Sequence, residues 1–178
     1  MIREACKEDS TRIAEIYSLG RWSELSKLFF FKVIIIKLFL KEIFLERIKK
    51  NFLESFTCNK NYLKTYVFEE DNIIKAFMII GNYKDEDKKD ESYNVLNLYV
   101  DTPFQRQNIG KKLMEYCVQM AENNNKTEIN LCIFEKNKSA IKFFKKIGFK
   151  LYGNKYKNII LNVNEIKMVK TLYNELAK

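Results

Sequence analysis

Apolar residues recur at helical spacing in three parts of the chain, and each part carries a signal for where a helix begins or ends. Asp9 and Ser10, both good N-cap residues, precede the first part. Asn123-Asn124-Asn125 stops the second, and Gly148 closes the third as a left-handed cap. The pattern predicts three helices, with apolar faces formed by Ile13, Ile16 and Tyr17, by Ile109, Leu113, Cys117 and Met120, and by Ala140, Phe143, Phe144 and Ile147.

Seven other segments are short and rich in β-branched and aromatic residues, which is typical of strands. A tight turn at Glu70-Asp71-Asn72 joins two of them, and Pro103 ends another because proline cannot donate to a ladder. The charged run from Tyr83 to Ser92 predicts a solvated loop. The expected strands are Ile2–Cys6, Tyr62–Glu69, Ile73–Gly81, Tyr93–Val100, Glu128–Phe134, Phe149–Gly153 and Glu165–Leu172.

The stretch from Arg21 to Ser55 is helical in composition and contains neither glycine nor proline. It predicts two helices with a break near Lys37 to Glu42. The part from Leu28 to Leu45 is strongly apolar, but four charged residues interrupt it, so we do not expect a membrane span. It is expected either to roof the sheet or to form a wall of an acceptor pocket or a homodimer surface.

The composition narrows the classes of function. With 178 residues, 47% of them apolar, the chain suits one compact domain over residues 1–178. Lys and Arg number 32 against 23 Asp and Glu, and the net charge of +9 favours anionic partners such as nucleotide phosphates. The sequence has no histidine, which excludes histidine-based triads and histidine-ligated zinc.

The four cysteines, Cys6, Cys58, Cys117 and Cys132, form no CxxC pair, so we expect no metal site. The N-terminus lacks the apolar stretch of a signal peptide, and we therefore expect a cytoplasmic protein with free thiols. Cys132 is expected to be a buried, inert thiol because no histidine can activate it.

The segment from Leu98 to Leu113 predicts a strand that leads through a short turn into a helix. The unpaired N–H groups and the dipole at the start of such a helix form a site for an anion. Gly110 allows a phosphate to approach the backbone, Asn108 tolerates a positive φ, and Arg106, Lys111 and Lys112 add positive charge. The segment contains neither a Walker loop nor a GxGxxG fingerprint.

Two blocks of residues make this chain resemble the GNAT-type N-acetyltransferases. Residues Gln105-Arg106-Gln107-Asn108-Ile109-Gly110 are similar to the acyl-coenzyme A signature [Q/R]-x-x-G-x-[G/A], with Asn108 in place of one glycine. The block from Asn137 to Phe149 resembles the superfamily segment N-x-x-A-x-x-F-Y-x-K-x-G-F. The resemblance is strongest from Tyr93 to Gly153 and weakest from Arg21 to Ser55.

The resemblance implies an α/β (α+β) fold. A mixed, mostly antiparallel central sheet of about seven strands would be flanked by about four or five helices, with a splayed V between strands four and five. Acetyl-coenzyme A would lie in that opening as the co-substrate, with no metal. The residues that the resemblance places at the coenzyme are Leu98, Tyr99, Val100, Gln105, Arg106, Gln107, Asn108, Ile109, Gly110, Lys111, Asn137, Ala140, Phe143, Phe144 and Lys146.

Two positions depart from the family pattern and leave the catalytic residues open. Many relatives have a glutamate at Asn94 and a tyrosine at Phe144, and neither residue present here can exchange a proton. A water chain ending on Glu69, Glu70 or Glu91 could replace the base, and Tyr152 or Tyr156 could replace the acid.

The leading hypothesis is an N-acetyltransferase that acts on a primary amine of a small molecule, a peptide or a protein. The alternative is a non-catalytic acyl-coenzyme A-binding or sensor module. A nucleic-acid-binding domain ranks last, because only the net charge favours it.

Overall fold

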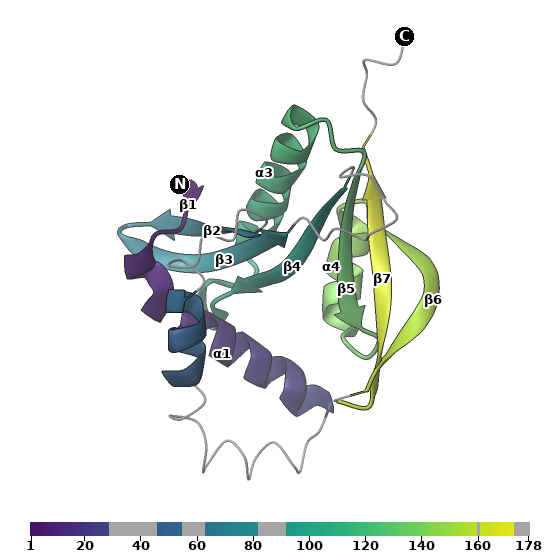
Figure 1. Cartoon of the computed structure of the whole chain (residues 1–178), viewed down its shortest axis with the longest axis horizontal. Helices are drawn as coiled ribbons and strands as arrows, with labels where there is room; N and C mark the ends of the chain where they lie inside the picture. Colours follow the sequence, from purple (N-terminus) through teal and green to yellow (C-terminus); the bar gives the residue numbers. More distant parts are fainter. Residues whose placement is uncertain (29–45, 55–62, 82–91, 160, 173–178) are drawn as a thin grey trace. The chain divides into compact units, whose positions relative to one another are not determined.

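The computed structural model of the chain describes residues 1–28, 46–54, 63–81, 92–159 and 161–172 (Figure 1). Residues 46–54 are helical in addition to the elements that follow. In chain order these are β1 (Ile2–Glu4), a 3₁₀ turn η1 (Lys7–Asp9), α1 (Ser10–Leu28), β2 (Leu63–Glu70), β3 (Ile73–Gly81), β4 (Ser92–Val100), a 3₁₀ turn η2 (Thr102–Phe104), α3 (Ile109–Asn123), β5 (Glu128–Phe134), α4 (Lys138–Lys146), β6 (Lys150–Asn158) and β7 (Val163–Thr171).

The strands form one seven-stranded mixed sheet in the order β1-β2-β3-β4-β5-β7-β6. The pairs β1–β2, β5–β7 and β6–β7 are antiparallel, whereas β4 and β5 are parallel. The parallel ladder runs from Ser92 opposite Glu128 to Val95 opposite Leu131, although both strands continue beyond it. The predicted fold class, with strands four and five separating past a short ladder, is therefore confirmed.

The chain clusters into two compact units. Unit 1 comprises Met1–Ile79 and Asn97–Leu113, and unit 2 comprises Ile80–Leu96 and Met114–Lys178. Strands β3 and β4 and helix α3 each run from one unit into the other. In unit 1, α1 packs on β2 and β3 through the buried residues Ile13, Ile16, Val67, Ile74 and Phe77.

Several element boundaries differ from those expected. Helix α1 continues through Gly20 to Leu28 in one piece. Asp9 lies in η1 directly before α1, where its carboxylate accepts the Cys6 N–H (2.8 Å) and pairs with Arg3 (2.7 Å). The hydrogen bond with Arg3 lowers the pKa of Asp9. The break expected near residues 37–42 lies outside the described residues.

The β6 strand is longer than expected because Gly153 does not end it. Gly153 has φ = +68° and lies in an irregularity between the pairs Tyr152–Lys167 and Tyr156–Glu165, beyond which the ladder resumes. β6 is an edge strand, and eight of its nine residues are exposed. The turn between β2 and β3 is as predicted, with positive φ at Asp71 (55°) and Asn72 (59°).

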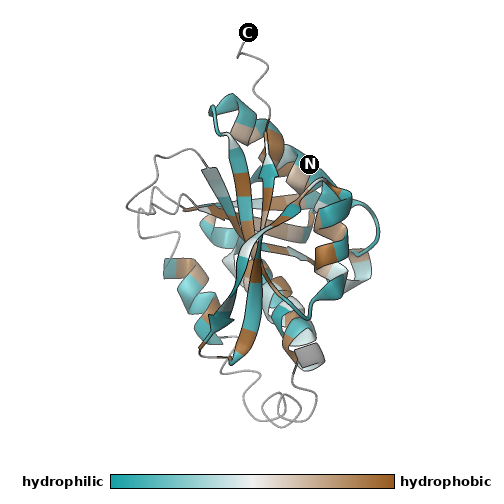
Figure 2. Cartoon of the chain, turned by 90° about the vertical axis from the view of Figure 1, so that its right-hand side faces the viewer, coloured by the Kyte–Doolittle hydropathy of each residue, from teal (hydrophilic) through white to brown (hydrophobic). Residues whose placement is uncertain are grey.

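In unit 2, directly paired residues share a face of the sheet, and successive residues alternate between faces. Ile129 is paired with Lys170, whose ammonium group donates to the Ile147 carbonyl at the end of α4 (2.8 Å). The face that carries Ile129 and Lys170 is therefore the face that α4 covers. Figure 2 shows the corresponding alternation of hydrophobic and hydrophilic residues along the strands.

Helices that cross a membrane must be long and apolar. No helix within residues 1–28, 46–54, 109–123 or 138–146 meets both conditions.

Gly20 of α1 lies against the Tyr99 ring of β4 in unit 1. A Cβ atom at this position would lie 2.2 Å from Cδ1 of Tyr99, whose ring also stacks on Phe77 at 5.8 Å. Alanine normally stabilises a helix interior by about 1 kcal/mol relative to glycine. At position 20 the overlap with the Tyr99 ring makes alanine destabilising instead.

We predict that Gly20→Ala lowers the free energy of unfolding by about 1–3 kcal/mol, the usual cost of overpacking a core. Urea denaturation measures the change. In a Tyr99→Leu background the same substitution should be neutral or stabilising, because the ring that causes the overlap is gone. A stabilising effect of Gly20→Ala in the otherwise unchanged chain would contradict this packing.

Candidate functional site

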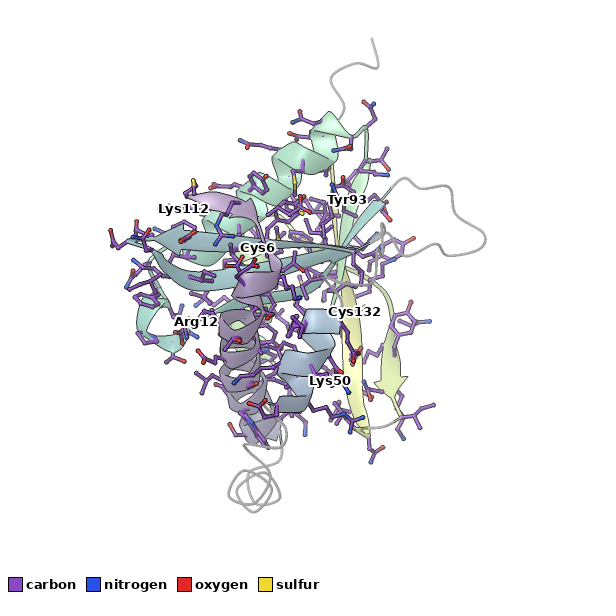
Figure 3. All side chains as sticks on the ribbon, turned by 60° about the vertical axis from the view of Figure 1, so that its left-hand side comes forward. Cys6, Arg12, Lys50, Tyr93, Lys112 and Cys132 are labelled. Carbon is purple, nitrogen blue, oxygen red and sulfur yellow. The ribbon has the colours of Figure 1, made fainter. Side chains whose placement is uncertain are left out.

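The turn between β4 and α3 is fastened to the rest of unit 1 at Asp101. This carboxylate is buried, caps η2 by accepting the Thr102 N–H (2.8 Å), and is paired with Arg12. Figure 3 labels Arg12 on α1. Arg12 also donates to the main-chain carbonyl of Ile74 (3.1 Å), and the Asp101 N–H donates to the main-chain carbonyl of Lys75 (2.9 Å). One ion pair thus joins α1, β3 and the start of the turn.

Two residues of the turn have left-handed backbone conformations, Arg106 with φ = 65° and Asn108 with φ = 60°. The positive φ at Asn108 was expected from its residue type and is confirmed. Arg106 was not expected there, because arginine carries no local signal for this region. The side chains of Gln105 and Gln107 close the turn by donating to the carbonyls of Val100 (3.1 Å) and Pro103 (3.4 Å).

The first hydrogen bond of α3 runs from the Lys112 N–H to the carbonyl of Asn108 (3.0 Å). The N–H groups of Ile109 and Gly110 therefore have no acceptor within the helix. Arg106, Lys111 and Lys112 are exposed at the same turn. The arrangement provides main-chain donors, the positive end of a helix and cationic side chains, which together suit a phosphate group.

Tyr99 uses its side chain for the core of unit 1. Its ring packs edge-on against Tyr17 at 5.5 Å, and its hydroxyl donates to Glu24 (3.1 Å). Burial and the nearby Glu24 carboxylate raise the pKa of this phenol. Only the backbone of Tyr99, between Leu98 and Val100, remains for contact with a ligand.

The carboxylates considered as proton acceptors in unit 1 are engaged in ion pairs. Glu69 accepts from Arg3 (2.6 Å), and Glu70 accepts from Lys75 (2.6 Å). The hydrogen bond with Lys75 lowers the pKa of Glu70 and raises that of Lys75. Glu91 lies outside the described residues.

The second predicted block lies in unit 2 and forms α4 with its caps. The side-chain oxygen Oδ1 of Asn137 accepts the Ala140 N–H (3.2 Å), which confirms the predicted N-cap. Gly148 ends the helix with φ = 95°, as expected. Phe144 is buried, and its ring centroid lies 4.9 Å from that of Phe143 and 5.4 Å from that of Phe149. Ala140 and Lys146 lie on the same helix. A phenylalanine in this setting supplies packing and no proton.

The sheet face opposite α4 gathers the remaining candidates of unit 2. Asn94 lies opposite Asn130, and Tyr152 lies opposite Lys167, which in turn is paired with Cys132. The Lys167 ammonium group lies 5.2 Å from the Tyr152 ring centroid. Asn130 was not singled out in the sequence, because an asparagine within a strand gives no sign that it is buried.

Cys132 is exposed, so the expectation of a buried thiol was wrong. It points from β5 to the face that α4 leaves uncovered, where the alternation of the strand places it. Partial desolvation and the nearby Glu165 carboxylate raise its pKa, and Lys167 offsets this only in part. The side chain is therefore a thiol rather than a nucleophilic thiolate near neutral pH.

The chain thus combines a mixed sheet, whose central parallel strands pair over only four residues, with a turn after β4 that suits a phosphate group. The family described as "Acetyltransferase (GNAT) domain" matches residues 61–151, just over half of the chain. The chain therefore belongs to the GNAT acetyltransferase family.

Solved structures share this fold at low sequence identity. The PaiA N-acetyltransferase from Thermoplasma acidophilum, in complex with coenzyme A, is 15% identical with a TM-score of 0.75, covering 97% of this chain and 98% of that one. The ribosomal-protein-alanine N-acetyltransferase from Brucella melitensis is 18% identical with a TM-score of 0.71, covering 97% and 99%. A Bacillus anthracis protein in complex with acetyl coenzyme A is 21% identical with a TM-score of 0.56, covering 65% of each chain.

We predict that Arg12→Met lowers the free energy of unfolding by about 2 kcal/mol, because it leaves the buried Asp101 carboxylate without its cation. Urea denaturation measures the loss. The matched control is Glu15→Gln, which removes the other, more exposed partner of Arg12 (3.3 Å) and should cost less than about 0.5 kcal/mol. Equal effects of the two substitutions would contradict the role given to Asp101.

Proposed function

We propose that this protein is an acetyl-coenzyme A-dependent N-acetyltransferase that transfers an acetyl group to a primary amine. Membership of the GNAT family and the coenzyme complexes of two structural relatives support the proposal. The observation that carries it is the turn after β4, with positive φ at Arg106 and Asn108 and main-chain donors at Ile109 and Gly110.

The pyrophosphate of the coenzyme would be held by main-chain N–H groups from Arg106 to Gly110, because the Gln105 N–H already donates to the Thr102 carbonyl (3.3 Å). Arg106, Lys111 and Lys112 would supply charge. The pantetheine arm would pair with the backbone of Leu98 and Val100, as an added strand does. Residues of the α4 block, namely Asn137, Ala140, Phe143, Phe144 and Lys146, would contribute further coenzyme contacts. The turn is preorganised by the pair between Arg12 and Asp101, so little ordering remains for the ligand to induce.

Amide formation requires attack by a neutral amine on the thioester carbonyl and departure of the thiolate. Main-chain donors at the separated part of β4 can polarise the carbonyl. Positioning of the two reactants supplies much of the acceleration in such a reaction, and the coenzyme thiolate leaves readily. The chemistry therefore does not depend on an acid at Phe144 or a base at Asn94.

The relatives leave several classes of acceptor open. One relative is described as a ribosomal-protein-alanine N-acetyltransferase, which corresponds to a protein amine. We propose an amine of a small molecule, a peptide or a protein as the acceptor of this chain.

A coenzyme-binding module without transferase activity is the second candidate, and the residues at Asn94 and Phe144 favour it. A thiol-release assay with acetyl-coenzyme A and a panel of primary amines separates the two. Turnover with any amine excludes the module, whereas coenzyme binding without turnover across the panel favours it.

We predict that Gly110→Trp abolishes binding of acetyl-coenzyme A in isothermal titration calorimetry, because the indole would occupy the space of the phosphates at the start of α3. Gln119→Trp is the matched control, since Gln119 is exposed on the same helix away from its N-terminus. It should leave the affinity within about twofold, because surface substitutions of this kind usually change little. Unchanged affinity in Gly110→Trp would overturn the placement of the pyrophosphate.

A further inference from the structure

Asn130 is the clearest unexplained polar group in the part of the chain that the structure describes. The residue is only 6% exposed, and its Oδ1 atom has no hydrogen-bond donor among the described residues. Buried polar atoms in native proteins nearly always have a partner, because a missing hydrogen bond costs free energy. A buried acceptor without a donor therefore leaves one hydrogen bond for a ligand atom or a bound water molecule to make.

The register of the sheet places this atom at an informative point. Asn130 lies directly opposite Asn94, one pair before the parallel ladder ends at Val95 and Leu131. Both amides are on the sheet face opposite the one that α4 covers, since Asn130 alternates with Ile129 along β5. Asn94 and Asn130 thus form a pair of neutral amides next to the point where β4 and β5 separate.

The surroundings on this face are polar and partly accessible. Next along the strands are Cys132, which is exposed, and Lys167, with Tyr152 beside it at 53% exposure. No carboxylate is paired directly with Asn94 or Asn130 in the registers of β4, β5 and β7, where Asn130 is opposite Val169. A donor group that reached Oδ1 would meet an uncharged acceptor.

We propose that Oδ1 of Asn130 accepts a hydrogen bond from the amino group of the acetyl acceptor, an inference that rests on the proposed function. A primary amine carries N–H groups with which to satisfy this oxygen, and its lone pair can then point at a carbonyl carbon. Asn130 holds the amine and takes no proton from it. The C–N bond forms as the C–S bond breaks, one proton of an arriving ammonium passes to water, and a second goes to the departing sulfur.

The site favours acceptors with a free N–H donor over fully substituted amines. The same oxygen would reject a carboxylate, which has no donor to offer. Asn94, directly opposite, presents a second amide to the same region.

The first test observes Asn130 directly and does not require turnover. In ¹⁵N–¹H spectra of the full chain with coenzyme A, n-butylamine should shift the side-chain amide signals of Asn130, assigned by their absence in Asn130→Leu. n-Butyltrimethylammonium, which has the same chain and charge but no N–H group, should not. Equal shifts with both probes, or none with either, would overturn the inference.

The second test uses two substitutions with opposite chemistry at the same position. Asn130→Leu removes the acceptor and should raise the KM for any amine that is turned over by about tenfold, with kcat within about twofold. Asn130→Asp keeps an oxygen in place and should retain or lower that KM. If Asn130→Leu lowered kcat alone, the result would indicate that Oδ1 hydrogen-bonds a water molecule, and it would reject the amine contact.

A stability measurement separates this role from a structural one. Because Asn130→Leu removes an unsatisfied buried atom, its melting temperature without ligand should equal or exceed that of the unchanged protein. Asn158→Leu is the matched control: its side chain donates to Glu165 (2.8 Å) and accepts from Leu161 (3.0 Å). Asn158→Leu should lower the melting temperature and leave the KM for the amine unchanged. A lower melting temperature with an unchanged KM in Asn130→Leu would contradict the proposal.

Failure of this inference differs from failure of the proposed function. Calorimetry with acetyl-coenzyme A reports on the coenzyme site alone. Coenzyme binding with no response of Asn130 to n-butylamine rejects the amine contact, and the reverse result rejects the coenzyme site while retaining the contact.

Discussion

The ion pair between Arg12 and Asp101 is the constraint on which the turn between β4 and α3 depends. A buried carboxylate is costly unless a cation and hydrogen bonds compensate it, and Asp101 has both. In return it fixes where β4 ends and η2 begins, directly ahead of the left-handed residues Arg106 and Asn108. The strain of these two residues is therefore offset by contacts made elsewhere in unit 1.

The periodic elements and the strand–turn–helix conformation around Asn108 could be predicted from the sequence, because their signals are local. The cap at Asn137, the left-handed Gly148 and the β2–β3 turn each depend on neighbouring residues, and the structure confirms them. The reason for a glycine within α1 could not be predicted, since the Tyr99 ring that a Cβ at Gly20 would meet lies 79 positions away in the sequence. The predicted end of β6 at Gly153 was wrong, because this glycine lies in a β-bulge within the strand.

The candidate site likewise contains residues that the sequence could predict and residues that it could not. Motif spacing was enough to predict which residues would contact the coenzyme, and that assignment stays a prediction. The burial of Asn130 and the exposure of Cys132, in contrast, depend on sheet register and on what covers each face. No local pattern in β5 distinguishes an asparagine that only packs in the core from one that contacts a ligand. Side chains that remain unsatisfied after folding are visible only once the long-range pairs are known.

The edge strand β6 has a consequence for how copies of this protein meet. It carries Lys150, Lys155 and Lys157 and no acidic residue, and its bulge opposes three residues to one on β7. Like charges and a broken hydrogen-bond repeat make such an edge a poor template for another strand. Fibrillar or edge-to-edge growth of the sheet is thus disfavoured, even though nearly the whole strand is open to water.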